Sequence, residues 1–256
     1  MVKIKPDSQS DEYLFALLGV ENFRPDSLSR LRHYFNFIRN NAHEIEGDIW
    51  EFGVFKGVSL CATALLLKEI GSDKKVFGMD SFSGFPSYHR HDSLDQFRLK
   101  CPSIFSENFR DMAEQSHEIV ARRSLRDSQA ANISSSGAFD DTSVDLVRAK
   151  LKEYDLDNVV LIEGPFEDTI PEITEVMSEK IFAANIDCDL YSGYEVALPF
   201  CWRGLVDGGF IHLDEYYSLK FPGAKIATDE FCSSKNIKPV RMEGRPGEFE
   251  RWALLK

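Results

Sequence analysis

The sequence has no long apolar run and no apolar leader. Its most apolar stretch, LCATALLL at 60–67, is far too short to span a bilayer, because a spanning helix needs about 20 apolar residues. The start, MVKIKPDSQSDEYLF, contains no apolar segment of signal-peptide length. These absences predict a soluble, cytoplasmic protein without a membrane partner.

Cysteine and positive charge are also scarce. The five cysteines include no C-x-x-C pair and their number is odd, so they indicate neither a disulfide framework nor a zinc knuckle. Lys and Arg total 30 against 42 Asp and Glu, which gives a net charge of -12. Because this charge repels phosphate backbones, nucleic acid is not an expected partner. The acidity either serves solubility or collects in part around a cation.

Strand and helix patterns alternate along most of the chain. With 256 residues it fits one large α/β domain, which we expect to span 1–256. The predicted strands are 48–55, 75–82, 158–164, 180–190 and 208–217. The predicted helices are 58–70 (closed by Gly71), 143–154, 167–177, 192–205 and 224–234. This alternation implies a mainly parallel sheet, and the end of the chain predicts a closing antiparallel pair.

Two segments lie outside this alternation. Apolar residues spaced three or four apart at 11–42 predict two helices, separated by FRPDS at 23–27, within an N-terminal annex over 1–45. The polar stretch 88–136 has no strand pattern and is the candidate insertion. Both segments are candidates for a lid over an active site.

The predicted strands all end in carboxylates. In open α/β sheets, ligands bind beyond the carboxyl ends of the strands, so these acids are candidate site residues. They are Glu51, Asp80, Glu163, Asp187, Asp189, Asp214 and Glu215.

A glycine loop follows the first strand. Gly53 and Gly57 let the backbone approach a ligand, although a tight strand-to-helix turn explains them equally well. Their spacing departs from the dinucleotide pattern G-x-G-x-x-G. Asp80 can accept both hydroxyls of a ribose, or it can cap a turn. The negative charge of Glu51 and Asp80 disfavours a pyrophosphate and suits a nucleoside that carries an amine and a sulfonium.

The strongest acidic cluster is Asp187, Asp189, Asp214 and Glu215. Neighbouring parallel strands lie about 4.8 Å apart, so adjacent ends of the fourth and fifth strands would bring these acids together. Such acids repel unless protons or a cation compensate, and oxygen ligands favour Mg²⁺, Ca²⁺ or Mn²⁺ over Zn²⁺. Asp187 and Asp189 share a face only if the strand continues that far. Unrelated solvated acids are the alternative interpretation.

Five motifs follow one another at these strand ends. They are EGDIWEFGVFKGVS, VFGMDSFSGFP, LIEGPFEDTIP, IDCDLYSGYEVAL and GGFIHLDEYY. In this order they resemble motifs of macrocin O-methyltransferases, which methylate sugar hydroxyls on macrolides. The resemblance runs from about residue 46 to the C-terminus and is weakest across 88–136. It implies a Rossmann-like class I methyltransferase fold, whose mainly parallel sheet has the order 3-2-1-4-5-7-6, with strand seven antiparallel and helices on both faces.

The resemblance also implies S-adenosylmethionine, Mg²⁺ and a small-molecule acceptor, a sugar or polyol. The cofactor positions, from the methionine end through the ribose to the adenine, would be Glu51, Gly53, Gly57 and Ser59, then Asp80, Ser81 and Phe82, then Phe166 and Glu167. The metal ligands would be Asp187, Asp214 and Glu215, and Asp189 matches the general base. The family usually has two adjacent aspartates where this chain has Asp214-Glu215, so the longer Glu215 shifts either the metal or the backbone.

The implied reaction is methyl transfer to a hydroxyl that Mg²⁺ orients and Asp189 deprotonates. His89 and His91 in the variable stretch either contact the acceptor or are solvated loop residues. His212 either supports the metal ligand Asp214 or is a core histidine.

Three rival interpretations stay open. The first is a metal-independent methyltransferase of the same fold, acting on oxygen or nitrogen. The second is an NAD-binding oxidoreductase, which the missing third glycine and the acidic strand ends disfavour. The third is a non-catalytic binding protein. The apolar N-terminal helices suggest a homo-oligomer, such as a homodimer.

Overall fold

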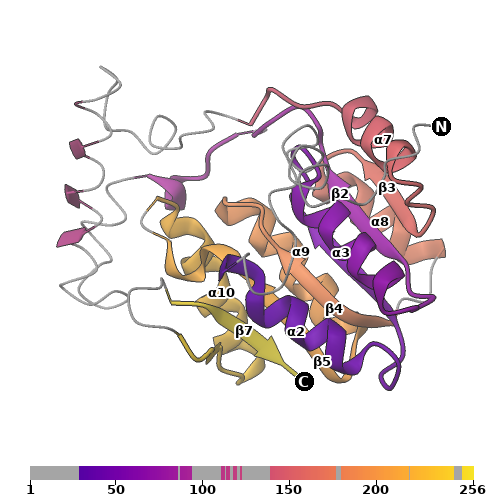
Figure 1. Cartoon of the computed structure of the whole chain (residues 1–256). Helices are drawn as coiled ribbons and strands as arrows, with labels where there is room; N and C mark the ends of the chain where they lie inside the picture. The colour runs from indigo at the N-terminus through magenta and orange to yellow at the C-terminus, as the bar shows by residue number, and fades with distance from the viewer. Residues whose placement is uncertain are drawn as a thin grey trace.

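The computed structural model contains a seven-stranded sheet (Figure 1). It describes residues 29–85, 87–93, 139–176, 180–218, 220–244 and 250–256, and a few positions between 111 and 122. The strands are β1 (Asp48–Phe52), β2 (Val76–Asp80), β3 (Val159–Glu163), β4 (Ile181–Ile186), β5 (Leu205–Leu213), β6 (Val240–Arg241) and β7 (Trp252–Leu255). Their order is β3-β2-β1-β4-β5-β7-β6, and β7 pairs antiparallel with both β5 and β6. The expected sheet order and the antiparallel seventh strand are confirmed.

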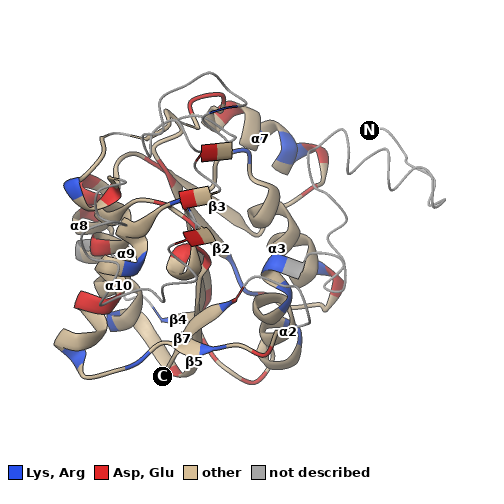
Figure 2. Ribbon diagram, turned by 90° about the vertical axis from the view of Figure 1, so that its left-hand side faces the viewer, with Lys and Arg blue, Asp and Glu red and all other residues tan. Residues whose placement is uncertain are grey.

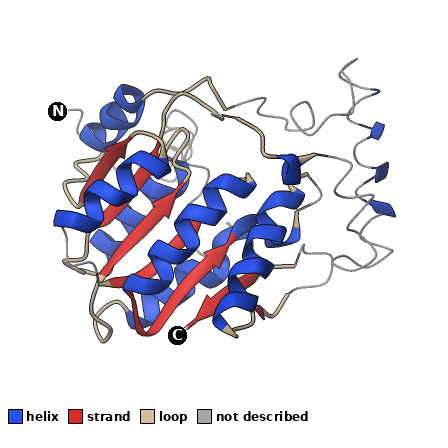
Figure 3. Ribbon diagram, turned by 180° about the vertical axis from the view of Figure 1, so that it is seen from behind, coloured by secondary structure: helices blue, strands red, loops and turns tan. Residues whose placement is uncertain are grey.

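Helices cover both faces of the sheet (Figure 3). The α-helices are α2 (Arg32–Asn41), α3 (Val58–Glu69), α7 (Val144–Glu153), α8 (Phe166–Val176), α9 (Tyr191–Gly204) and α10 (Pro222–Lys235). Short 3-10 helices are η1 (Ser29–Leu31), η2 (Arg90–Asp92) and η3 (Asp214–Tyr217). Side chains of α2, α3 and α7 share one apolar core with the sheet, and those of α8, α9 and α10 share a second. All six residues of β4 are buried between these layers, as expected for a central parallel strand.

The helix α3 carries the turn that follows β1. Its residues from Ser59 to Ala64 are all buried, which is typical of a helix with apolar contacts on every side. It starts after Gly57 (φ 78°) and is followed by Gly71 (φ 67°), two left-handed positions that glycine adopts without strain. The predicted helix at 58–70, closed by Gly71, is therefore confirmed.

Three predicted strands extended clearly too far. The first, fourth and fifth strands were expected to reach residues 55, 190 and 217, but β1 ends at Phe52, β4 at Ile186 and β5 at Leu213. Beyond β4, Asp189 has a φ of 60°, so the chain has left the extended conformation before the second acid of the D-x-D motif. Asp187 and Asp189 therefore do not share one face of a strand.

The two segments outside the alternation are described in part. The second predicted N-terminal helix is confirmed by η1 and α2, whereas the first lies outside the described residues. Of the segment 88–136, the structure describes 88–93 and a few positions between 111 and 122. The lid function of both segments stays a prediction.

The surface of the described elements carries both signs of charge. Figure 2 shows acidic and basic residues interspersed over helices such as α7 and α10, whereas the charged residues of α8 are all acidic. Within the described part of the chain, no helix combines the length and apolar character that crossing a membrane requires.

Candidate active site

The carboxyl ends of four neighbouring strands form one edge of the sheet. β2, β1, β4 and β5 are adjacent and parallel, so they end on the same side. Backbone bonds continue the ladder one residue further: Gly53 N–H donates to the Met79 carbonyl at 3.0 Å, and Asp187 N–H to the Phe52 carbonyl at 2.9 Å. The residues that follow these strands are thus held in lateral register.

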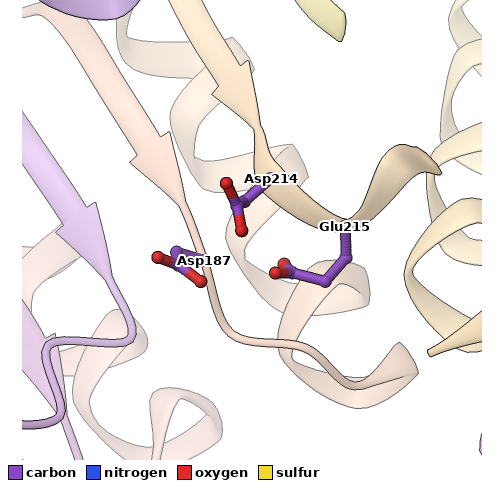
Figure 4. Close-up of side chains that lie close together, drawn as sticks. All are labelled: Asp187, Asp214 and Glu215. Carbon is purple, nitrogen blue, oxygen red and sulfur yellow. The ribbon is translucent and has the colours of Figure 1, made fainter. Parts of the chain in front are cut away.

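Three acids converge at the ends of β4 and β5 (Figure 4). One carboxylate oxygen from each of Asp187, Asp214 and Glu215 lies within 4.8 Å of the other two. Ile186 and Leu213 are register partners, so the residues that follow them emerge side by side. Three of the four acids predicted to come together do so, and Glu215 joins the two aspartates despite its extra methylene. Their function as metal ligands stays a prediction.

Arg30 of η1 bridges the two aspartates. Its Nη1 donates to Asp214 Oδ2 at 2.9 Å, and its Nη2 lies 3.1 Å from Asp187 Oδ2. The Asp187 and Asp214 charges raise the pKa of Arg30 above its usual value. The singly charged guanidinium of Arg30 therefore lies between carboxylates that follow two neighbouring strands.

The acids do not share this compensation equally. Burial and the charge of Asp214 raise the pKa of Asp187 to about 6, against the effect of Arg30. Burial and the charges of Asp214 and Asp187 also raise the pKa of Glu215 well above its usual range. Burial disfavours charge on Asp214 too, but Arg30 and His212 outweigh it and lower the pKa of that carboxyl. The site therefore favours the charged form of Asp214 and disfavours the charged form of Glu215.

Asp189 lies beside this cluster. Burial, followed by the charges of Asp187 and Asp214, raises the pKa of Asp189 well above its usual value, while Lys220 and Arg30 act in the opposite direction. Its left-handed backbone is sparsely populated for a non-glycine residue, and such strain concentrates at functional sites. A carboxyl with a raised pKa suits a general base that works near neutral pH.

Two buried side chains hold the acids in place. The Tyr194 hydroxyl of α9 lies 2.9 Å from Glu215 Oε2 and accepts the Glu215 N–H at 3.1 Å. His212 Nε2 lies 3.4 Å from Asp214 Oδ1, which agrees with the supporting function considered for this histidine. Both residues are fully buried, so their orientation is set by packing.

The predicted glycines are required by the chain itself. Gly53 has a φ of 92°, and a Cβ there would lie 1.9 Å from the Asp187 carbonyl oxygen. Gly57 has a φ of 78°, and a Cβ there would lie 3.0 Å from Val147 Cγ1. The tight-turn interpretation thus accounts for both glycines. Their contact with a cofactor stays a prediction.

Asp80 organises the turns around the glycine loop. Val54 N–H and Phe55 N–H both donate to Asp80 Oδ2 at 2.8 Å, and Phe82 N–H donates to Asp80 Oδ1 at 2.7 Å. Phe55 and Phe82 both have a φ of 50°, which is unusual for bulky residues. The turn-capping interpretation of Asp80 is therefore met. A carboxylate has about four acceptor positions, so these three bonds leave little capacity for a ribose.

Glu51 is buried with one oxygen unpaired. Ser59 Oγ donates to Glu51 Oε1 at 2.8 Å, while Oε2 has no hydrogen-bond partner among the described residues. Burial, partly offset by the Ser59 bond, raises the pKa of Glu51 to about 8. An orphaned acceptor of this kind, one strand from the acidic cluster, fits a ligand that carries an amine.

The remaining predicted cofactor positions lie at the same edge. Ser81 Oγ donates to the Gly84 carbonyl at 3.0 Å, and Phe82 is buried. Phe166 opens α8 and packs edge-on against Phe52, with ring centroids 5.5 Å apart. Glu167, next to it, is exposed.

The segment 87–93 docks at the start of α9. Asp92, fully buried, accepts the Tyr191 N–H at 2.8 Å and the His89 N–H at 2.9 Å. The His89 ring stacks on Tyr191 with centroids 4.4 Å apart, and His91 is buried. The solvated-loop interpretation is therefore wrong for His91. Aromatic packing holds this segment against Tyr191, which lies two residues after Asp189 in the chain.

Sequence reasoning missed Arg30, Tyr194 and Asp92. Arg30 and Asp214 are 184 residues apart, and no periodicity links them. Tyr194 belongs to the predicted helix at 192–205, where its hydroxyl was the available signal. Asp92 follows YHRH, and an acid three residues after His89 was a signal for the capping interaction that the structure contains.

Comparisons with known proteins agree with this architecture. The model of the macrocin-O-methyltransferase (TylF) family matches residues 26–142 and 122–243. None of the curated proteins matches the sequence.

Similar solved structures extend along the whole chain. The O-methyltransferase NovP has a TM-score of 0.60 and 20% identity over 96% of this chain and 98% of its own. The calicheamicin methyltransferase CalS11 has a TM-score of 0.59 and 19% identity over 98% and 94%. Its apo structure, described as a TDP-rhamnose 3′-O-methyltransferase, has a TM-score of 0.52 and 19% identity over 98% and 96%. An O-methyltransferase from Bacillus cereus in complex with SAH has a TM-score of 0.51 and 14% identity over 100% and 94%. At these identities the likeness shows a shared fold.

Proposed function

The chain belongs to the macrocin-O-methyltransferase (TylF) family and is a methyltransferase, and on that premise we propose its reaction. It transfers the methyl group of S-adenosylmethionine to a hydroxyl of a sugar or polyol-containing small molecule, with the help of Mg²⁺. The observation that carries this proposal is the convergence of Asp187, Asp214 and Glu215 beside Asp189.

The donor set fits Mg²⁺. All three side chains offer carboxylate oxygens, which this hard cation prefers to nitrogen or sulfur. Ligand oxygens about 2.1 Å from one ion lie at most about 4.2 Å apart. Oxygens already within 4.8 Å of one another need only small side-chain adjustments to meet this spacing. When bound, Mg²⁺ supplies Lewis acidity toward the acceptor hydroxyl.

The residues of the chain perform the remaining steps. Asp189 takes the hydroxyl proton, since the neighbouring acids and burial raise its pKa toward the working range of a base. Tyr194 and His212 keep Glu215 and Asp214 oriented. The acceptor oxygen then forms a bond to the methyl carbon while the carbon–sulfur bond breaks, and S-adenosylhomocysteine leaves. Alignment of the two reactants is the main contribution of such a site.

The cofactor would lie along the ends of β1 and β2. Its amine would meet the unpaired Glu51 Oε2 near Ser59, with Gly53 and Gly57 in the loop between them. Ser81 and Phe82 would face the ribose, to which Asp80 can offer at most the acceptor position that its three backbone bonds leave. Phe166 and Glu167 would face the adenine. The SAH complex of the Bacillus cereus enzyme, which shares this fold, supports the choice of cofactor.

The acceptor class rests on the family and on two relatives. The family is described by macrocin O-methylation, and CalS11 is described as acting on TDP-rhamnose. We therefore place a sugar hydroxyl, free or within a larger natural product, above Asp189. The segment 87–93, docked on Tyr191, would form one wall of its pocket.

The test is radiolabelled methyl transfer from S-adenosylmethionine to a panel of deoxysugar nucleotides, TDP-rhamnose included. We expect EDTA to abolish transfer and Mg²⁺ to restore it. Asp189→Asn is expected to lower turnover by about 10²–10⁴-fold while the affinity for S-adenosylhomocysteine is unchanged. Glu46→Gln, which removes an exposed carboxylate paired with Lys180, is the matched control.

The outcomes separate the rival functions. Transfer that survives EDTA would establish a metal-independent methyltransferase. Binding of NADH in place of S-adenosylhomocysteine would establish an oxidoreductase. Full activity of Asp189→Asn would remove Asp189 as the base and leave the family assignment intact.

A further inference from the structure

Arg30 occupies the position that the proposed cation would take. We infer that Arg30 is a built-in counter-ion, which partly compensates the charges of Asp187 and Asp214 in the metal-free protein and leaves when a divalent cation binds. The inference rests on the metal dependence proposed above. It assigns to Arg30 control over the affinity and selectivity of the site for cations.

The two cations would compete for the same oxygen atoms. The guanidinium uses its two terminal nitrogens separately, one on Asp214 Oδ2 at 2.9 Å and one on Asp187 Oδ2 at 3.1 Å. These two side chains are only 8% and 15% exposed, so water screens their charges poorly. A divalent ion ligated by the same carboxylates would lie within a few ångströms of the guanidinium, and like charges repel strongly at that separation in a partly buried site.

The side chain of Arg30 can leave without disturbing the fold. The Arg30 side chain is 46% exposed, so it reaches the acidic cluster from the solvent side. The next residue, Leu31, is 2% exposed and belongs to the core, as do Tyr34 and Phe35 of α2. The backbone of η1 is therefore anchored, and rotation of one long side chain into solvent is sufficient to vacate the site.

Competition of this kind has a defined consequence. A cation must displace Arg30 before it binds, so its apparent affinity falls by the fraction of molecules in which Arg30 is not seated. In return, the acids stay gathered when no cation is present, because one positive charge holds the strand ends together. A monovalent ion only replaces the single positive charge of Arg30, so its binding gains little free energy from the exchange. A divalent ion brings one positive charge more than the guanidinium that it displaces.

Cation binding to the purified full-length chain tests the inference. Mn²⁺ titration followed by electron paramagnetic resonance, without cofactor or acceptor, measures the dissociation constant directly. We expect Arg30→Ala to bind Mn²⁺ about 10-fold more tightly than the wild type, and Arg30→Lys to fall between them. The matched control is Arg39→Ala, which removes an arginine of α2 paired with Glu69 away from the cluster. It should leave the affinity unchanged.

Thermal unfolding supplies a second readout. Without metal, Arg30→Ala should melt at a lower temperature than the wild type, since its acids are uncompensated. Saturating Mg²⁺ should raise its melting temperature more than it raises that of the wild type, because tighter binding stabilises more.

Each result decides between the two proposals. Equal or weaker Mn²⁺ binding by Arg30→Ala, in a protein whose wild type binds Mn²⁺, would overturn the competition and leave the metal site intact. Absence of Mn²⁺ binding in every variant, together with methyl transfer in EDTA, would overturn both the competition and the metal dependence. Arg30 would then be a permanent counter-ion.

Discussion

The carboxylates at the ends of β1 and β2 differ from those at the ends of β4 and β5. Asp80 accepts three backbone N–H groups, and Glu51 accepts the Ser59 hydroxyl. Asp80 thereby shapes the glycine loop, and Glu51 is tied to the first turn of α3. Asp187 and Asp214 instead face one another, and the counter-charge between them is a half-exposed arginine.

This difference separates structural acids from acids arranged for a ligand. Backbone donors of a loop cannot be removed without remodelling the loop, so Asp80 belongs to the architecture. The guanidinium of Arg30 can rotate away, so Asp187 and Asp214 can exchange partners. The turns at the ends of β1 and β2 are therefore fixed before any ligand binds, whereas the acids at the ends of β4 and β5 can change partners.

The largest test of this contrast is Asp214→Asn. We expect Mn²⁺ affinity to fall by more than about 100-fold, because even loss of groups behind the ligands costs about 10–100-fold. Methyl transfer should fall at least as far, and the unfolding free energy measured in urea should fall too, because the lowered pKa of Asp214 means that its charge stabilises the fold. Isothermal titration with Mn²⁺ and an assay of the same preparation check both parts.

The matching experiment uses Asp80 at the end of β2. Asp80→Asn should destabilise the chain, since an amide nitrogen would face backbone N–H donors, and it should leave Mn²⁺ affinity unchanged. A large loss of Mn²⁺ binding in Asp80→Asn, or none in Asp214→Asn, would contradict the distinction between the ends of β1 and β2 and the ends of β4 and β5.

A second test concerns the close contact between the residues that follow β1 and β4. Gly53→Ala places a Cβ 1.9 Å from the Asp187 carbonyl oxygen at a φ of 92°, so backbone must shift at both strand ends. We expect a loss of about 3 kcal/mol in the unfolding free energy, from overpacking and backbone strain together. Urea denaturation followed by circular dichroism measures it.

Gly71→Ala isolates the strain contribution in that test. Gly71 has a φ of 67°, but no atom lies within 4 Å of the Cβ that alanine would add. It should therefore cost only about 1 kcal/mol. Equal losses in the two variants would mean that the close approach of β1 and β4 carries no energy of its own.

The sequence predicted the sheet well because strand and helix periods are local signals. Five strand ends carrying acids, in family order, were enough to expect Asp187, Asp214 and Glu215 in one place. Two kinds of information were missing. The turn after β4, with Asp189 at a φ of 60°, decided where that strand ends, and a contact across 184 residues decided that Arg30 lies among the acids. Neither leaves a periodic trace in the sequence.

The distinction between Glu51 and Asp80 was likewise invisible in the sequence. Both residues are acids at the ends of neighbouring strands, and both were expected to face a cofactor. In the structure, Asp80 accepts three N–H groups, whereas one buried oxygen of Glu51 has no hydrogen-bond partner in the described part of the chain. Which donors the turns present depends on their φ angles, and those follow from packing.

The last test concerns the pH dependence set by Glu51. Burial raises the pKa of Glu51 to about 8 in the folded chain, against about 4.3 for an exposed glutamate. Between these values the folded chain holds one proton more than the unfolded chain, so raising the pH lowers the unfolding free energy. This single group contributes a slope on the order of 1 kcal/mol per pH unit. Glu51→Gln lacks that contribution and keeps an acceptor for Ser59, so its stability relative to the wild type should rise steadily from pH 5 to pH 8. Urea denaturation at each pH measures the difference, with Glu163→Gln, an exposed acid at the end of β3, as the control. Parallel stability curves for Glu51→Gln and the wild type would show that Glu51 is ionised in the fold, and its unpaired oxygen would then need a cation of its own.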